Sequence, residues 1–293
     1  MTLNKKSYKG TRDFFPKLKR NQNYCFSKMI EVAELFGYEP YDGPLLEEVE
    51  LYKAKSGEEL IDQQIYSFTD RGNREVAIRP EMTPTLARMV AQICKEVPRP
   101  IRWYSIPNLM RYERPQKGRL REHWQFNVDI FGAKNDFAEL EIIQMAIMLF
   151  NNFGADENHF EILVNNRIII DFVFNDLMTL NKDDSYKLYK IIDQSKKIGP
   201  DKFKTLLDEL GLNGSAKTIF TNYLKVNSFQ ELISFLKTYN FDFTKWDAEN
   251  FYHNLQELKI DQYIKYDASI VRGLDYYTGL VFEIFDKAPN NNR

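Results

Sequence analysis

The stretch "IRWYSIPNLMRYERPQKGRLREHWQFNVDIFG", residues 101–132, decides the fold. It holds two runs rich in aromatic and aliphatic residues, 101–113 and 120–132, on either side of the charged segment "RPQKGR". Runs of this composition favour β-strands, and a short charged segment with a glycine favours a loop between them. The stretch therefore predicts two strands joined by a loop that contains Gly118.

The second run alternates between apolar and polar residues, as a strand with one buried face does. One face would carry four apolar side chains, Trp124, Phe126, Val128 and Ile130. The other would carry Arg121, His123, Gln125, Asn127 and Asp129. A solvated face is the alternative interpretation, but such faces usually show Lys, Glu and Thr. This row favours the binding of a small polar ligand.

The segments before this stretch predict a mixture of short elements. Residues 22–36 have apolar residues at helical spacing, and Gly37 is expected to end that helix. The prolines in "YEPYDGPLLE", residues 38–47, favour an extended segment. A short strand is expected at residues 76–79, and Thr83 is expected to cap the helix that follows it.

The later part of the chain changes its pattern. A buried helix at residues 136–153 and a strand at 159–166 are expected before a long series of Lys/Asp/Leu-rich helices. Strand patterns return at Lys265. We therefore expect an α+β fold with a mostly antiparallel sheet flanked by helices. Its core would comprise residues 1–166 and 263–293, interrupted by a helical insertion at 167–262.

Composition narrows the function further. The 293 residues are 43% hydrophobic and 28% charged with a formal net charge of −2, as in a globular protein outside the membrane. The charged N-terminus is not typical of a signal peptide. The two cysteines are too few for a disulfide framework, which indicates the cytoplasm, and the three histidines lack metal-site spacing. No Walker, Rossmann or Gly-x-Ser-x-Gly motif is present.

A second unusual stretch is "VRGLDYYTGLVFEIF", residues 271–285. Alone, it could be a turn followed by an aromatic strand. Together, "RPEMTPTLAR" (79–88), "RYERPQKGRLREHWQ" (111–125) and "RGLDYYTG" (272–279) resemble the histidyl-tRNA synthetases, which are class II aminoacyl-tRNA synthetases. The resemblance runs from "KGTRDFFP" near the start to the last residues and is weakest in the helical insertion. "RYERPQKGR" resembles class II motif 2, "FGYEPYDGPLLE" resembles motif 1, and "RGLDYYTG" is similar to a signature of the histidyl enzymes.

The resemblance implies a reaction in which L-histidine and ATP form histidyl-adenylate and pyrophosphate, followed by transfer of histidine to the 3' end of tRNA(His). The attacking carboxylate is already an anion, so the reaction needs positioning and positive charge rather than a nucleophile–base pair. Arginine suits this because it binds phosphate oxygens bidentately and stays charged. The resemblance also implies Mg²⁺ accompanying ATP and a homodimer built on motif 1, while no metal ligand is identified among the protein side chains.

The resemblance assigns the ATP-binding roles residue by residue. Arg111 would hold the α-phosphate, Glu113 would accept a hydrogen bond from the adenine amino group, and Arg119 would reach the outer phosphates. Arg272 would approach the α-phosphate from the opposite side, so Arg111 and Arg272 are the expected catalytic residues. His123 stands where the family usually has a phenylalanine stacked on adenine, so the adenine contact is altered.

The same resemblance implies a histidine pocket. The α-ammonium would be received by Glu81, Thr83 and Gln125. The imidazole would be read by Asp129, Tyr276 and Tyr277, since a carboxylate and a phenol can satisfy both ring nitrogens. Met82, Arg111 and Arg272 complete the expected histidine-binding set. A buried site of this kind discriminates strongly against analogues that lack the paired groups.

Three alternatives remain at this point. The first is the regulatory subunit of ATP phosphoribosyltransferase, a paralogue that senses histidine but typically loses residues from motif 2 and "RGLDYYTG". The second is a synthetase for threonine or proline, which would lack the tyrosine pair. A structural role would require every motif to be accidental. Because the sequence ends at Arg293, before motif 3 and the anticodon-binding domain, we expect a catalytic-domain fragment that retains histidine binding but has much weaker ATP binding and pyrophosphate exchange.

Overall fold

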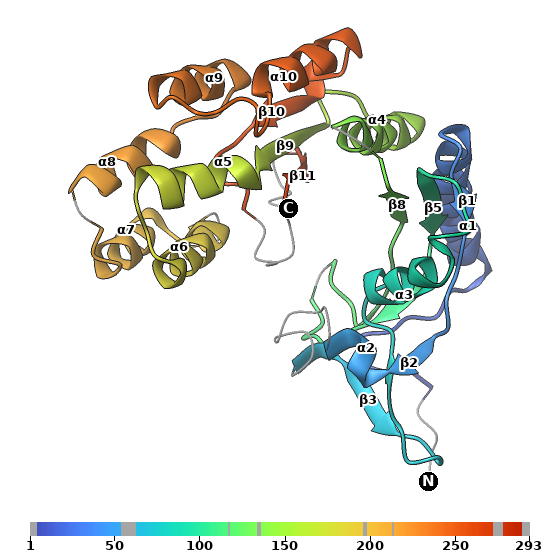
Figure 1. Ribbon diagram of the computed structural model, residues 1–293. Coiled ribbons are helices and arrows are strands. Elements are labelled where there is room, and N and C mark those ends of the chain that lie inside the picture. The colour runs from blue at the N-terminus through green and yellow to red at the C-terminus, as the bar shows by residue number, and fades with distance from the viewer. Residues whose placement is uncertain are drawn as a thin grey trace. The chain divides into compact units, whose positions relative to one another are not determined.

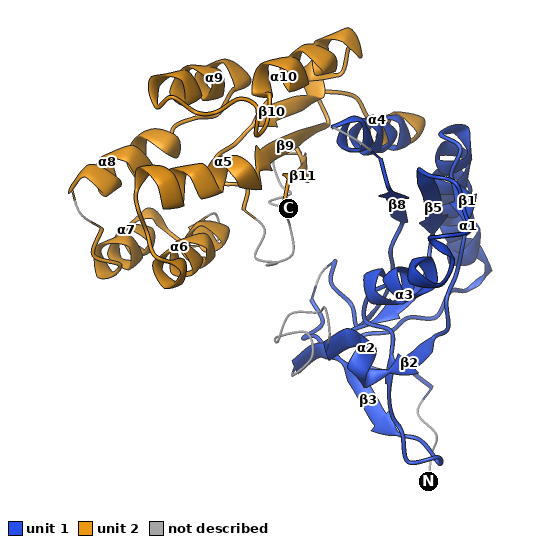
Figure 2. Cartoon of the chain, in the orientation of Figure 1, with its two compact units in different colours: residues 1–149 blue, residues 150–293 orange. Residues whose placement is uncertain are grey.

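Small, mostly antiparallel sheets flanked by helices make up the computed structural model (Figure 1). The structure describes residues 5–53, 63–116, 118–133, 136–195, 198–212, 214–271 and 278–288. The chain divides into two compact units, residues 1–149 and 150–293, which are coloured separately in Figure 2. Within the described residues, no helix combines the length and apolar character that crossing a membrane requires.

The first unit contains the strands predicted around residues 101–132. Its helices are α1 (Pro16–Leu35), α2 (Val49–Lys53), α3 (Thr83–Ile93) and α4 (Phe137–Asn152), the last of which continues into the second unit. Its strands are β1 (Glu39–Pro40), β2 (Leu46–Glu48), β3 (Tyr66–Thr69), β4 (Glu75–Ile78), β5 (Ile101–Ser105), β6 (Asn108–Met110), β7 (Glu122–Trp124) and β8 (Asn127–Phe131). They form the sheets β1-β5-β8 and β2-β4-β3 and the ribbon β6-β7.

The second unit places a series of helices beside one sheet, ordered β10-β9-β11. Its strands are β9 (Phe160–Asn166), β10 (Ile264–Tyr266) and β11 (Leu280–Asp286). Between β9 and β10 lie α5 (Arg167–Asp171), the π-helical turn η2 (Phe172–Leu177), α6 (Lys182–Ser195), α7 (Pro200–Glu209), α8 (Gly214–Tyr223), α9 (Phe229–Thr238), α10 (Ala248–Glu257) and the 3-10 turn η3 (Asp261–Tyr263). The predicted change to helices is thus observed, while the domain boundaries proposed from it stay a prediction.

The mostly antiparallel character of the sheets is confirmed. Only the pairs β1–β5 and β10–β9 are parallel among the described strands, and β9 pairs with β11 in the antiparallel direction. Each of the two predicted strands is divided, the first into β5 and β6 and the second into β7 and β8. Strand β6 pairs with β7, and β5 pairs with β8. Proline has no N–H to donate at Pro107, and its carbonyl accepts from the Gln125 amide at 3.3 Å across the interruption.

The sheet β1-β5-β8 separates two apolar layers. On one side, Phe126, Val128 and Ile130 pack with buried residues of α1 and α4, which include Val32 and Met145. On the other side, Trp103 and Phe131 pack with α3 through Leu86 and Val90. The predicted alternation along residues 126–130 is therefore confirmed.

Two helix boundaries differ from the sequence-based prediction. The first helix begins at Pro16, six residues before the predicted start, because proline is well placed in the first turn of a helix. Its end agrees with the prediction, since Gly37 has φ +77° and donates to the Glu34 carbonyl. The predicted cap at Thr83 is wrong. Thr83 is already helical, and the residue before it, Met82, is the N-cap without a side-chain cap.

Candidate active site

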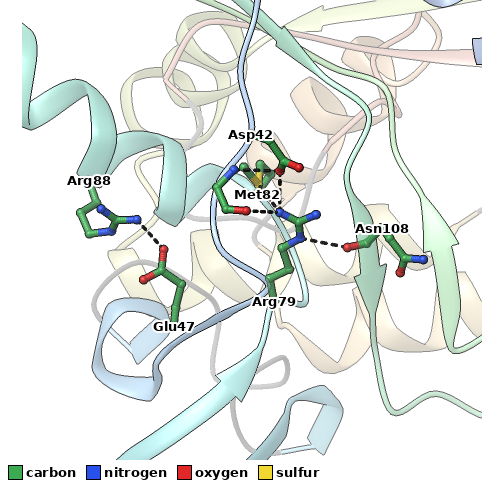
Figure 3. A network of polar contacts seen from close by, with 7 residues as sticks. Asp42, Glu47, Arg79, Met82, Arg88 and Asn108 are labelled. Atoms are coloured by element: carbon green, nitrogen blue, oxygen red, sulfur yellow. Dashed lines mark hydrogen bonds and ion pairs between the residues drawn. The ribbon is translucent and has the colours of Figure 1, made fainter.

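A buried arginine anchors the segment that carries Glu81 and Thr83, two of the three predicted ammonium-binding residues (Figure 3). Arg79, at the end of β4, is 5% exposed. Its guanidinium donates to the Asp42 carboxylate at 2.7 Å, to the Gly43 carbonyl at 2.8 Å and to the Asn108 carbonyl at 2.9 Å. Charge-assisted bonds of this kind are the stronger ones in proteins. Arg79 therefore joins β4, β6 and residues 42–43 at the point where residues 80–83 begin.

Packing fixes the same segment from the other side. A Cβ atom at Gly43 would overlap Cγ2 of Thr85, so only glycine permits this close approach to α3. The Met82 side chain is fully buried, and its sulfur lies 3.9 Å from Nη1 of Arg79. Thr83, by contrast, is exposed at the start of α3. The segment is thus held by its middle residue, while the next residue faces outward.

Arg111 and Glu81 lie beside each other. Arg111 follows β6, and its Nε donates to the Pro80 carbonyl at 2.9 Å. Its Nη2 is 3.9 Å from Oε2 of Glu81, and the two side chains are 26% and 17% exposed. One residue predicted to bind phosphate and one predicted to bind an ammonium group are therefore adjacent.

The remaining predicted ATP-binding residues come together at the end of the β6-β7 ribbon. Arg119 makes a bidentate ion pair with Glu113 through Nε and Nη2, and these hydrogen bonds hold the pKa of the Glu113 carboxyl below its usual value. Burial, and then the positive charge of Arg111, lowers the pKa of His123. Because a lowered pKa keeps the imidazole neutral near pH 7, His123 offers an uncharged ring beside this cluster.

An open polar cavity of about 290 Å³ lies next to this cluster. Its lining includes Glu113 and Arg119, together with five residues that the sequence did not single out: Gln63, Gln64, Tyr112, Arg114 and Gln116. Amides such as those of "QQ" at 63–64 follow no periodic pattern, so no local sequence pattern indicates them. The cavity has the polar lining and planar donors that a nucleotide base requires.

Asp129 occupies a different environment, on β8. It pairs across the sheet with Trp103 of β5, and the Trp103 ring lies 5.6 Å from the Tyr41 ring. Burial raises the pKa of Asp129 to about 6. Among the described residues no hydrogen bond or ion pair reaches its carboxylate. Burial raises the pKa of Tyr41 to about 12, and the charge of Asp129 contributes to this rise. Asp129 is thus a half-buried carboxylate for which the structure shows no donor among the described residues.

The other predicted site residues are either exposed or outside the described residues. Gln125 is exposed at the interruption between β7 and β8. Arg272, Tyr276 and Tyr277 lie outside the described residues, so their roles stay predictions. In the part of the chain that the structure describes, no group of three or more His, Cys, Asp or Glu side chains is arranged to hold a metal ion.

Solved structures share this arrangement of strands and helices. The ATP phosphoribosyltransferase regulatory subunit/histidyl-tRNA synthetase from Bacillus halodurans C superposes with a TM-score of 0.85 over 99% of this chain and 75% of its own, at 22% identity. The histidyl-tRNA synthetase from Nostoc sp. PCC 7120 gives a TM-score of 0.77 over 97% of this chain and 65% of its own, at 23% identity. The fold is that of a class II aminoacyl-tRNA synthetase catalytic domain.

Sequence comparison is more specific. The chain belongs to the histidyl-tRNA synthetase family, whose sequence model matches residues 10–292. It is 44% identical to a histidine--tRNA ligase of Leptospira biflexa serovar Patoc over 99% of the chain, and 40% identical to one of Thermoplasma volcanium over 96%. The chain spans 66% and 64% of the length of these two relatives.

Proposed function

We propose that the protein carrying this chain is a histidine--tRNA ligase. It would form histidyl-adenylate and pyrophosphate from L-histidine and ATP, and then transfer histidine to the 3' end of tRNA(His). The observation that carries the proposal is the adjacency of Arg111 and Glu81, 3.9 Å apart. In the adenylate, the α-ammonium and the α-phosphate are separated only by the Cα and carboxyl carbons and one oxygen. A carboxylate for the first group and an arginine for the second must therefore be neighbours.

The chain's own residues have distinct roles in the first step. A histidine carboxylate oxygen forms a bond to the α-phosphorus, the bond to the bridging oxygen breaks, and pyrophosphate leaves with its negative charge. Arg111 would stabilise the charge that gathers on the α-phosphate. Glu113 would exchange its bond to Arg119 for one from the adenine amino group, which frees Arg119 for the outer phosphates. Mg²⁺ enters with ATP as part of the substrate complex.

The amino-acid pocket would read both ends of histidine. Glu81, Thr83 and Gln125 are proposed for the α-ammonium, with Met82 lying between the first two. Asp129 is proposed for the imidazole, because a desolvated carboxylate gains most from an N–H donor. The resemblance adds Tyr276 and Tyr277 to the imidazole pocket and Arg272 to the α-phosphate.

Further parts of the proposal concern the assembly, the domains and the location of the protein. The segment 36–47 resembles motif 1, so we propose a homodimer built on it. Residues 167–262 are proposed as an insertion domain, because the helices leave the sheet after β9 and return to the adjacent strand, β10. Cys25 and Cys94 are both free, in keeping with the proposed cytoplasmic location.

Histidine-dependent exchange of labelled pyrophosphate into ATP tests the proposal. The protein should catalyse it, and Arg111→Ala should lower its rate ~10²–10³-fold, as expected for the loss of one preorganised charge contact. Arg74→Ala is the matched control, since Arg74 is an exposed arginine of the first unit. Histidine binding without any exchange would instead identify a sensor like the regulatory paralogue and would overturn the proposed ligase.

A further inference from the structure

The segment Ser7–Thr11, here called the N-terminal strap, has no role in the proposed reaction, yet it is hydrogen-bonded to the backbone at the start of β7. The carbonyl of Gly10 accepts two backbone hydrogen bonds, from Arg121 at 2.8 Å and from Glu122 at 3.2 Å. Gly10 has φ +85°, and a Cβ atom there would lie 2.7–2.9 Å from three carbons of the Arg121 side chain. Only glycine fits this contact, because both its conformation and the space exclude a side chain.

Arg121 extends the contact from the strap to the proposed ATP-binding residues. Its side chain is buried, with the residue 7% exposed. Its Nη1 donates to the Tyr8 hydroxyl at 2.9 Å, and its Nε donates to the backbone carbonyl of Glu113 at 3.0 Å. Its guanidinium carbon lies 4.0 Å from the centre of the Tyr112 ring and 5.6 Å from that of Tyr8. Arg121 is therefore held between two tyrosines and holds the backbone of Glu113 in turn.

Backbone hydrogen bonds also connect Arg121 to the proposed ATP-binding residues. The Arg111 amide donates to the Arg121 carbonyl at 2.8 Å, and the Glu113 amide donates to the Arg111 carbonyl at 2.8 Å. The Tyr112 amide donates to the Gln64 carbonyl, which belongs to the lining of the polar cavity. The backbone positions that aim Arg111 and Glu113 thus depend on Arg121, and Arg121 depends on the strap.

We propose that the N-terminal strap is a positioning element for the nucleotide site and that Tyr8, Gly10 and Arg121 act as positioning residues. This inference rests on the proposed function, because it assumes that Arg111 and Glu113 bind ATP. The strap contacts the ribbon that carries these two residues. Glu81 and Asp129 lie on other segments, beside α3 and on β8. Loosening the strap should therefore weaken ATP binding much more than histidine binding, in which, of the described residues, only Arg111 and Gln125 adjoin the ribbon.

Two variants and one control test the inference. Tyr8→Phe removes only the hydroxyl that accepts from Arg121, and it leaves no cavity because Tyr8 is 56% exposed. Gly10→Ala forces the strap away from Arg121. Lys9→Ala is the control, since Lys9 is an exposed neighbour in the same segment. We expect the Kd for ATP to rise about 10-fold in both test variants, which corresponds to about 1.4 kcal/mol, with the Kd for histidine within about 2-fold.

Hydrogen–deuterium exchange supplies a readout that does not depend on ligands. The backbone amides of Arg121 and Glu122 should exchange about 10-fold faster in Gly10→Ala than in the parent or in Lys9→Ala. Unchanged exchange together with unchanged ATP affinity would overturn the inference. Equal losses of ATP and histidine affinity, with a lowered melting temperature in Tyr8→Phe as well, would also overturn it, because they indicate a merely structural role. Failure of the parent protein to bind ATP would overturn the proposed function and the nucleotide role of the strap, whereas the exchange data would still decide whether the strap holds the ribbon.

Discussion

Replacing Asp129 with asparagine should make the protein more stable and less able to bind histidine. Burial raises the pKa of Asp129 to about 6, compared with its ordinary value of 3.8. The shift of roughly two units means that ionising this carboxylate costs the folded state about 3 kcal/mol, at about 1.4 kcal/mol per unit. Asparagine has nearly the same shape and carries no charge, so the variant avoids this cost.

The sign of the pH dependence follows from proton binding. Between about pH 4 and 6 the folded protein holds a proton on Asp129 more often than the unfolded chain does, so the stability of the parent falls as pH rises through this range. Above about pH 6 the cost is complete. The stability gained by Asp129→Asn should therefore be about 3 kcal/mol at pH 7.5 and about 1 kcal/mol at pH 4.5.

Urea denaturation followed by circular dichroism at these two pH values measures the gain. Asp13→Asn is the matched control, because Asp13 is an exposed aspartate of the same unit. In the same samples, calorimetry should show histidine binding weakened by about 10- to 150-fold, as for the loss of a charge-assisted hydrogen bond of 1.5–3 kcal/mol. A variant that is no more stable at pH 7.5 than the parent, or that binds histidine as tightly, would refute the reasoning.

Three further predictions concern other polar contacts. In Arg119→Ala the pKa of Glu113 should rise toward its usual value. In the parent, the ion pair stabilises the fold above about pH 4.5, and this stabilisation is lost as the pH falls. The variant should lack this pH-dependent part of the free energy of unfolding. ATP affinity should fall at least 10-fold in calorimetry if Arg119 reaches phosphate, and unchanged affinity would contradict that role. Arg79→Met should lower the free energy of unfolding by about 2–4 kcal/mol in urea, because it leaves the part-buried carbonyls of Gly43 and Asn108 without their donor, whereas Arg74→Met, in an exposed ion pair, should have little effect. Tyr223→Phe should cost about 1–2 kcal/mol in the same assay, since its buried hydroxyl contacts Asn165 and a second tyrosine; an unchanged midpoint would show that this network adds no stability.

The sequence predicts the strands and faces near the site because that information is local. Alternation along residues 120–132 identifies the apolar face of β8, and the structure confirms it. The interruption at Pro107 and Gln125 was not predicted, although a proline within a strand-like run indicates one. The apolar spacing predicts a start of α1 that is six residues late, because Pro16 is the better signal for a first turn.

The contacts that position the site could not be predicted in this way. Arg79 and Asp42 are 37 residues apart, and Arg121 and Tyr8 are 113 apart. No periodicity relates residues at such separations, since the contact arises only when strands and loops have packed. The resemblance implies that Glu113 and Arg119 are separate ligands of ATP, but it does not imply that they bind each other.

The charged groups of the proposed nucleotide and histidine halves of the site differ in whether they are already paired. Glu113 and Arg119 neutralise each other, with the Arg119 side chain 54% exposed and that of Glu113 only 8% exposed, so Glu113 needs a replacement donor when Arg119 turns away. Under the proposed function, ATP would take both groups by exchange. Asp129 has no such partner among the described residues, and the fold already bears the cost of its burial. An N–H donor of bound histidine would offset that cost. Discrimination between amino acids at Asp129 should therefore be stronger than discrimination between nucleotides at the polar cavity. A site that reads one amino acid requires this asymmetry, because every synthetase accepts the same ATP while only one side chain must be recognised.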